Sequence, residues 1–212
     1  MTCYLIIGNN VDLKSWPYEK NATLIGVDRG AFRAVKAGLP LDLAYGDFDS
    51  VLDSEMALIN KGSKKVKKLN PIKDITDTYG AYLEAGKADK IVILGGIQGF
   101  RVEHFLALLN IVKKDPRVEI MDASSSIKHL VAKKEPYSVS SKDGFYFSFF
   151  SIGEATLSLQ NFFYPLENYV LKEGDSLCVS NRLAMLTSIG QISLSKGDLL
   201  MISSRDDHSQ LL

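Results

Sequence analysis

The sequence predicts a Rossmann-like, three-layer α/β fold with a mostly parallel sheet over residues 1–123, followed by an all-β sandwich over residues 124–212. In the first part, short apolar runs alternate with helix-like segments, as in parallel sheets that are covered by helices. In the second part the helical period disappears, and apolar residues alternate with polar ones between glycine-containing turns. We therefore expect two domains.

The first part contains five apolar runs that read as strands, each ending near Gly, Asn or Asp. They cover residues 3–8, 23–28, 41–47, 90–96 and 118–122. The segments between them that have helical spacing cover residues 30–39, 54–62, 76–87 and 101–114. A basic cluster at 61–68 is expected to be a solvated loop or helix end.

The second part shows four stretches with a period of two, separated by the turns KDG, KEGD and KGD. These expected strands lie within residues 144–152, 155–164, 176–181 and 190–203. The polar stretch at 123–131 is expected to be a flexible boundary between the two domains.

Composition excludes several classes of protein. The 212 residues contain 25 basic and 25 acidic side chains, so no overall positive charge favours nucleic acid as a partner. The two cysteines, Cys3 and Cys178, lack metal-ligand spacing and indicate reduced thiols. There is no signal-peptide pattern and no apolar stretch of roughly 20 residues, which predicts a cytoplasmic protein without membrane spans.

Acidic residues follow the predicted strand ends, where open parallel sheets bind their ligands. Asp28 ends the second strand, Asp47 and Asp49 follow the third, and Asp74 and Asp77 precede a helix. Each of them alone could simply be a helix cap or a turn residue. Together, they would repel one another unless a cation lay between them, and carboxylate oxygens without His or Cys suit Mg²⁺.

A glycine-rich loop follows the strand at 90–96 and leads into the next helix. Its residues Gly95, Gly96 and Gly99 would let backbone N–H groups approach phosphate, and Arg101 could grip phosphate oxygens. Neither a Walker A motif nor GxGxxG is present. The pattern therefore indicates a Mg-nucleotide site outside those two motif classes.

These motifs resemble, in the same order, those of the thiamin pyrophosphokinase (thiamin diphosphokinase) family. That family carries a block ending in GDFDS, then KDxTD, then GGxGGRxDH, and a β-rich C-terminal domain with YPLEN and SN. The corresponding segments here are VDRGAFRAVKAGLPLDLAYGDFDS (27–50), KDITD (73–77), GGIQGFRVEH (95–104), FFYPLENYVL (162–171) and VSNRL (179–183). The resemblance spans nearly the whole chain.

The resemblance implies transfer of diphosphate from Mg-ATP to the hydroxyl of thiamin, giving thiamin diphosphate and AMP. It assigns the metal and catalysis to Asp47, Asp49, Asp74 and Asp77, with Arg101 as a further catalytic residue. It implies ATP binding by Asn9, Asp28, Gly95, Gly96, Gly99, Arg101 and His104, and thiamin binding by Glu103, Ser180 and Asn181. Residues 1–123 would then be the catalytic domain, and residues 124–212 would bind thiamin and form a homodimer.

Four residues depart from the family pattern. Arg29 and Phe100 stand where the family has Gly, Glu103 replaces an Asp, and Cys178 stands where Gly or Thr is common. Two alternatives therefore stay open. The chain could transfer diphosphate to a different heterocyclic alcohol, or it could bind nucleotide or thiamin without catalysis.

Overall fold

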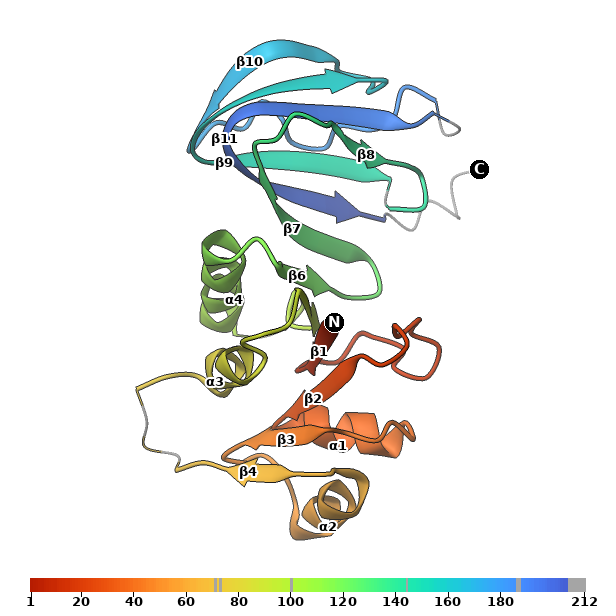
Figure 1. Cartoon of the computed structure of the whole chain (residues 1–212), viewed down its shortest axis with the longest axis vertical. Helices are drawn as coiled ribbons and strands as arrows, with labels where there is room; N and C mark the ends of the chain where they lie inside the picture. The colour runs from red at the N-terminus through yellow and green to blue at the C-terminus, as the bar shows by residue number, and fades with distance from the viewer. Residues whose placement is uncertain (71, 73, 100, 144, 186–187, 206–212) are drawn as a thin grey trace. The chain divides into compact units, whose positions relative to one another are not determined.

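Figure 1 shows the computed structural model of the chain. It describes residues 1–70, 72, 74–99, 101–143, 145–185 and 188–205. The chain divides into two compact units: Met1–Ile111 with Arg117–Ala123, and Val112–Pro116 with Ser124–Leu212. Within the described ranges, no helix has both the length and the apolar character that a membrane span requires.

The first unit is built on a sheet of parallel strands in the order β6-β5-β1-β2-β3-β4. The strands are β1 (Thr2–Ile6), β2 (Thr23–Val27), β3 (Leu43–Gly46), β4 (Val66–Lys68), β5 (Lys90–Leu94) and β6 (Val118–Met121). The chain moves outward from β1 to β4 and then returns to the other side of β1. The order of strands therefore reverses between β1 and β5, which is where such sheets open a crevice for ligands.

Helices cover both faces of this sheet (Figure 1). They are α1 (Arg29–Lys36), α2 (Asp53–Gly62), α3 (Asp77–Glu84) and α4 (Val102–Lys114). Neighbouring residues of a strand point to opposite faces. Ala44 shares a buried core with Ala31 of α1 and Ile59 of α2, whereas Tyr45 lies against Gly80 of α3. The predicted three-layer α/β arrangement is confirmed.

The second unit is an antiparallel β structure in the order β10-β9-β11-β7, with β8 also paired to β11. Its strands are β7 (Ser125–Val131), β8 (Tyr137–Val139), β9 (Tyr146–Gln160), β10 (Leu166–Lys172) and β11 (Gly190–Ser204). The β9–β11 pairing is irregular between Leu194 and Asp198. One apolar core takes Phe147 and Leu157 from the two halves of β9, so both halves cover the same interior.

Three predictions for the second unit are wrong in detail. The stretches at 144–152 and 155–164 contribute to one long strand, β9, because both pair with β11 even though Gly153 between them has a φ of 79°. The turn expected at 196–198 is an irregularity inside β11. Residues 177–180 form turns and bends instead of a strand, because Ser180 has a φ of 58° and leaves the extended conformation, and Asn181 makes only an isolated bridge to Phe147.

Four strands lie in segments that the sequence did not mark as strands, namely β4, β7, β8 and β10. The stretch expected to be a flexible boundary contains β7, whose buried positions hold Ile127 and Leu130. The basic cluster contains β4, and the YPLEN segment contributes the start of β10. In β4 and β10 most side chains are partly or fully exposed, which removes the apolar pattern that marks a strand in a sequence.

Candidate active site

Three aspartates from separate segments meet at the carboxyl ends of the strands. Asp28 follows β2, Asp47 follows β3, and Asp77 is the first residue of α3. Each offers one carboxylate oxygen, and these oxygens all lie within 4.8 Å of one another. All three residues are partly buried, so their charges are only partly screened by water.

The backbone around Asp28 fixes the position of its carboxylate. Asp28 has a φ of 48° and a ψ of −123°, a conformation that L-residues rarely adopt. Its N–H donates to the carbonyl of Tyr45 at 3.0 Å, and its Oδ1 accepts from the N–H of Phe48 at 3.3 Å. A Cβ on Gly46 would lie 1.9 Å from the same Oδ1, so the close approach requires glycine there.

The turn after β3 places Asp47 beside Asp28 and leaves Asp49 outside. Phe48 is buried with a φ of 58°, and this anchors the turn in the core. The Asp49 N–H donates to Asp47 Oδ1 at 3.2 Å, whereas the Asp49 side chain is exposed. Of these two acids, the structure therefore brings only Asp47 into the three-aspartate group.

The N-terminus of α3 places Asp77. The Thr76 side chain caps this helix by accepting from the N–H of Tyr79 at 3.2 Å. Asp77 in the first turn lies at the positive end of the helix dipole. Asp74 is exposed in the preceding segment and does not belong to the three-aspartate group.

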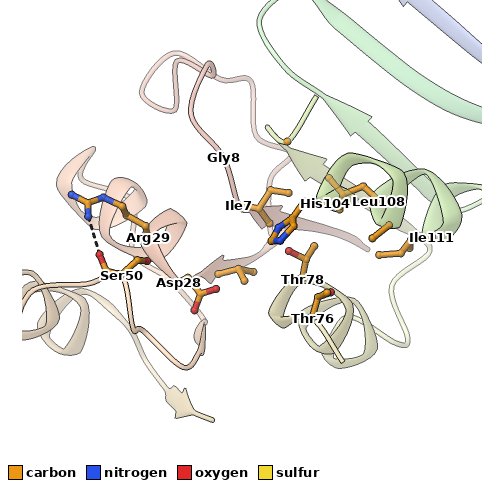
Figure 2. Close-up of a pocket in the computed structure, with 13 residues that line it drawn as sticks. Ile7, Gly8, Asp28, Arg29, Ser50, Thr76, Thr78, His104, Leu108 and Ile111 are labelled. Atoms are coloured by element: carbon orange, nitrogen blue, oxygen red, sulfur yellow. Dashed lines mark hydrogen bonds between the residues drawn. The ribbon is translucent and has the colours of Figure 1, made fainter. Parts of the chain in front are cut away.

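A cavity of about 280 Å³ opens beside these acids (Figure 2). Its wall includes Gly8 after β1, Asp28 after β2, Gly96 after β5 and His104 of α4. These residues surround the reversal point between β1 and β5, so the cavity lies where the fold predicts a ligand. Arg29, Ser50, Thr76 and Thr78 also line it. The first three lie within the motifs VDRG, GDFDS and KDITD but were not predicted as site residues, and Thr78 directly follows KDITD.

The glycine-rich loop lets two strand ends approach each other closely. Gly95 has a φ of 90°, and a Cβ on it would lie 2.6 Å from the Cα of Gly8. Gly96 lies on the cavity wall, whereas Gly99 is exposed with open space around it. Asn9, after β1, is also exposed.

The start of α4 carries a cation and an anion that pair with each other. The Arg101 Nε donates to Glu103 Oε1 at 2.7 Å, and both side chains are about two-thirds exposed, at 68% and 65%. This hydrogen bond holds the pKa of Glu103 below its usual value. Both side chains therefore lie at the surface. Phe100 lies outside the described residues.

The two residues predicted from the SN segment differ in exposure. Ser180 is exposed, whereas Asn181 is 3% exposed. The Asn181 amide oxygen accepts from the N–H groups of Tyr164 and Arg182, and its Nδ2 donates to the Tyr164 carbonyl at 2.8 Å. Asn181 therefore fixes the backbone beside Tyr164.

The three-aspartate group has the chemistry that a magnesium ion requires. Mg²⁺ binds oxygen ligands at about 2.1 Å, so neighbouring ligand oxygens lie about 3–4 Å apart. Oxygens of Asp28, Asp47 and Asp77 within 4.8 Å of one another approach this spacing. Because these three residues offer only carboxylate oxygens, the group suits Mg²⁺ better than metals that prefer Cys or His.

Fold and site together define an α/β enzyme with an acidic site at its strand ends, joined to a β-structured unit. Residues 17–121 match the family model described as "Thiamin pyrophosphokinase, catalytic domain", and residues 130–198 match "Thiamin pyrophosphokinase, vitamin B1 binding domain". The chain belongs to the thiamin pyrophosphokinase family, which is a family of transferases.

Individual relatives support this assignment. The thiamine pyrophosphokinase of Bacillus subtilis (strain 168) is 32% identical over 196 residues, which cover 89% of this chain and 90% of the relative. A crystal structure of the Bacillus subtilis enzyme matches 97% of this chain and 100% of its own, with 30% identity and a TM-score of 0.86. A thiamin pyrophosphokinase structure from Geobacillus thermodenitrificans matches 98% and 99%, with 27% identity and a TM-score of 0.83.

Proposed function

We propose that this chain transfers diphosphate from Mg-ATP to the hydroxyl of thiamin, producing thiamin diphosphate and AMP. The observation that carries the proposal is the three-aspartate group beside the strand-end cavity. Both family models and the Bacillus subtilis relative support the same reaction.

Asp28, Asp47 and Asp77 would hold Mg²⁺. When bound there, Mg²⁺ would neutralise charge on the phosphate oxygens of ATP. The proposal therefore changes the predicted ligand set: Asp28, expected to bind ATP, becomes a ligand. Asp49 and Asp74, which were also predicted as ligands, are exposed and lie outside the group.

Groups on the other side of the cavity would bind the phosphates of ATP. His104 and Gly96 line the cavity, and Arg101 directly precedes α4, the helix that carries His104. In the reaction, the thiamin oxygen forms a bond to the β-phosphorus while the bond from that phosphorus to the oxygen bridging to the α-phosphate breaks. AMP leaves with that oxygen, and a carboxylate accepts the thiamin proton. Asp49 and Asp74 lie outside the three-aspartate group and are our candidates for this base.

Thiamin recognition would involve the second unit, because the vitamin B1 binding family model matches residues 130–198. Ser180 is exposed and suited to direct contact. Asn181 would act through the backbone that it fixes beside Tyr164. Glu103 keeps its proposed role in substrate binding from the family resemblance.

We also propose a cytoplasmic homodimer. Large apolar side chains are exposed in the second unit, including Phe163, Tyr164, Leu177, Val179, Met185 and Ile189. Exposed apolar surface of this kind supports a protein interface. Light scattering during size-exclusion chromatography tests the proposal, and a mass of one chain at micromolar concentration would contradict it.

The test of the function is an assay of the purified chain with Mg-ATP and a set of alcohols. We expect AMP and thiamin diphosphate to appear in equal amounts with thiamin. AMP that forms only with a different heterocyclic alcohol would instead favour another diphosphokinase. Binding of ATP or thiamin without AMP formation would favour a non-catalytic protein.

A further inference from the structure

Arg29 directly follows Asp28, and its side chain turns toward the loop that carries Asp47 (Figure 2). Its Nη1 donates to the carbonyl oxygen of Ser50 at 2.8 Å. Its Nη2 pairs with Glu55 Oε1 of α2 at 3.2 Å. Arg29 thus connects the start of α1 with the end of the β3–α2 loop.

Glu55 extends this connection into the loop. Its side chain is only 12% exposed, so the carboxylate needs partners within the protein. Oε1 accepts from Arg29, and Oε2 accepts from the N–H of Leu52 at 3.1 Å. One buried carboxylate therefore links Arg29 to the loop and to the first turn of α2.

The loop is held at two points by neighbouring residues. Asp28 Oδ1 accepts from the N–H of Phe48, and Arg29 donates to the carbonyl of Ser50. Asp47 immediately precedes the first of these points. Asp28 and Arg29 thus restrain the loop at Phe48 and Ser50, which lie just after Asp47.

If Arg29 favours metal binding, its positive charge cannot be the reason. A guanidinium next to a group of aspartates repels a divalent cation, so by charge alone its removal would strengthen Mg²⁺ binding. Any benefit must therefore come from geometry. Arginine suits this role because its planar fork can reach two acceptors, whereas a lysine ammonium is a point charge on a flexible stem.

We propose that Arg29 and Glu55 are positioning residues that hold the Asp47 loop in the shape that binds the metal. The inference deepens the proposed function and rests on it. It gives a role to Arg29, at which this chain departs from the family pattern.

The test measures the Mg²⁺ concentration for half-maximal rate in the full chain at saturating ATP and thiamin. In Arg29→Ala, Arg29→Lys and Glu55→Gln we expect this concentration to rise by about tenfold or more, as for other residues that orient metal ligands. The KM for thiamin should change by less than about twofold, because this contact lies outside the proposed thiamin site. Lys36→Ala removes an exposed cation from the same helix and should match the wild type.

Hydrogen exchange gives a second readout that does not require activity. Amides of residues 48–52 should exchange faster in Arg29→Ala and Glu55→Gln than in the wild type or in Lys36→Ala. An unchanged or lower Mg²⁺ requirement in Arg29→Ala, with an active wild type, would overturn the inference and leave the proposed function standing. A wild type that produces no AMP would instead contradict the proposed function. In that case, unchanged exchange of amides 48–52 in Arg29→Ala and Glu55→Gln would also show that these residues do not restrain the loop.

Discussion

The Asp28 carboxylate has two tasks in the structure. It accepts a hydrogen bond from the Phe48 N–H, and it contributes an oxygen to the three-aspartate group. An Asn at this position keeps an acceptor oxygen for Phe48 but loses the charge that a cation needs. Substitution of Asp28 by Asn therefore separates loop structure from metal binding.

We expect Asp28→Asn, Asp47→Asn and Asp77→Asn each to lower kcat/KM for Mg-ATP by about a hundredfold or more, because each removes a proposed metal ligand. Melting temperatures should stay close to that of the wild type. Steady-state kinetics over a range of Mg²⁺ concentrations checks this prediction. Glu135→Gln, which removes an exposed acid from the second unit, serves as the control.

The two remaining acids provide a contrast. Asp49 and Asp74 lie outside the three-aspartate group, so their Asn variants should keep the wild-type dependence on Mg²⁺. The variant that removes the general base should lose kcat and the acidic limb of its pH profile. If Asp49→Asn or Asp74→Asn raised the Mg²⁺ requirement more than Asp47→Asn did, the assignment of the ligands would be wrong.

The acidic residues of the site could be predicted as a set, because each follows a strand or begins a helix. Which of them meet could not be predicted from spacing alone. Asp28 reaches Asp47 because β2 and β3 are neighbours, and because Gly46 leaves room for the Asp28 carboxylate. Neither the strand order nor that close approach can be read from a single sequence.

Cys3 is a buried thiol in β1, and burial raises its pKa from 9.0 to about 12. The folded chain keeps this proton above pH 9, whereas the unfolded chain loses it. The contribution of Cys3 to the free energy of unfolding should therefore be fully present below about pH 9. It should be lost progressively as the pH rises from about 9 toward 12. Denaturant unfolding at about pH 8 and about pH 10 checks this sign, and Cys3→Ala should show a smaller decrease. An equal decrease in Cys3→Ala would assign the effect to other groups.

At the scale of the elements, α3 approaches β3 more closely than an alanine would allow. A Cβ on Gly80 would lie 2.3 Å from the Tyr45 Oη, and Tyr45 is buried. This contact sets the spacing between the strand that leads to Asp47 and the helix that begins at Asp77. It explains why a glycine stands inside a helix, where it normally costs about 1 kcal/mol relative to alanine.

Gly80→Ala tests this spacing. Helix propensity alone would make the variant more stable by about 1 kcal/mol, but the clash should destabilise it by about 1–3 kcal/mol and increase the Mg²⁺ requirement. Thermal or denaturant unfolding measures the sign directly. Gly99→Ala, where an added Cβ meets nothing within 4 Å, should leave stability unchanged. A more stable Gly80→Ala with wild-type kinetics would show that the close approach is not required.

Elements with a strong apolar or helical pattern were predicted, and elements with a weak pattern were missed. Strands buried on both faces, such as β1 and β5, gave continuous apolar runs, and α4 gave a clear helical period. β4 was hidden because its three residues are mostly charged and only partly buried. β7 was hidden because two serines begin it, and because Lys128 and His129 stand between its buried apolar residues Ile127 and Leu130.

At the scale of the whole molecule, the change from a helical period to a period of two falls near residue 123, where the last segment of the first compact unit ends. The reversal of strand order beside β1 could not be predicted, because it depends on which edge of the sheet each crossover reaches. The single core of the second unit also depends on long-range pairing between β9 and β11. Local patterns identify strands but do not say which of them pair.

The central claim is that this chain moves the β- and γ-phosphates of ATP together onto thiamin. The most direct measurement follows ATP labelled at the β-phosphorus during turnover with thiamin and Mg²⁺. We predict that the label passes into thiamin diphosphate, that unlabelled AMP forms in equal amount, and that Asp47→Asn greatly slows the transfer. Formation of ADP with thiamin monophosphate, or retention of the label in ATP by the wild type, would contradict the account.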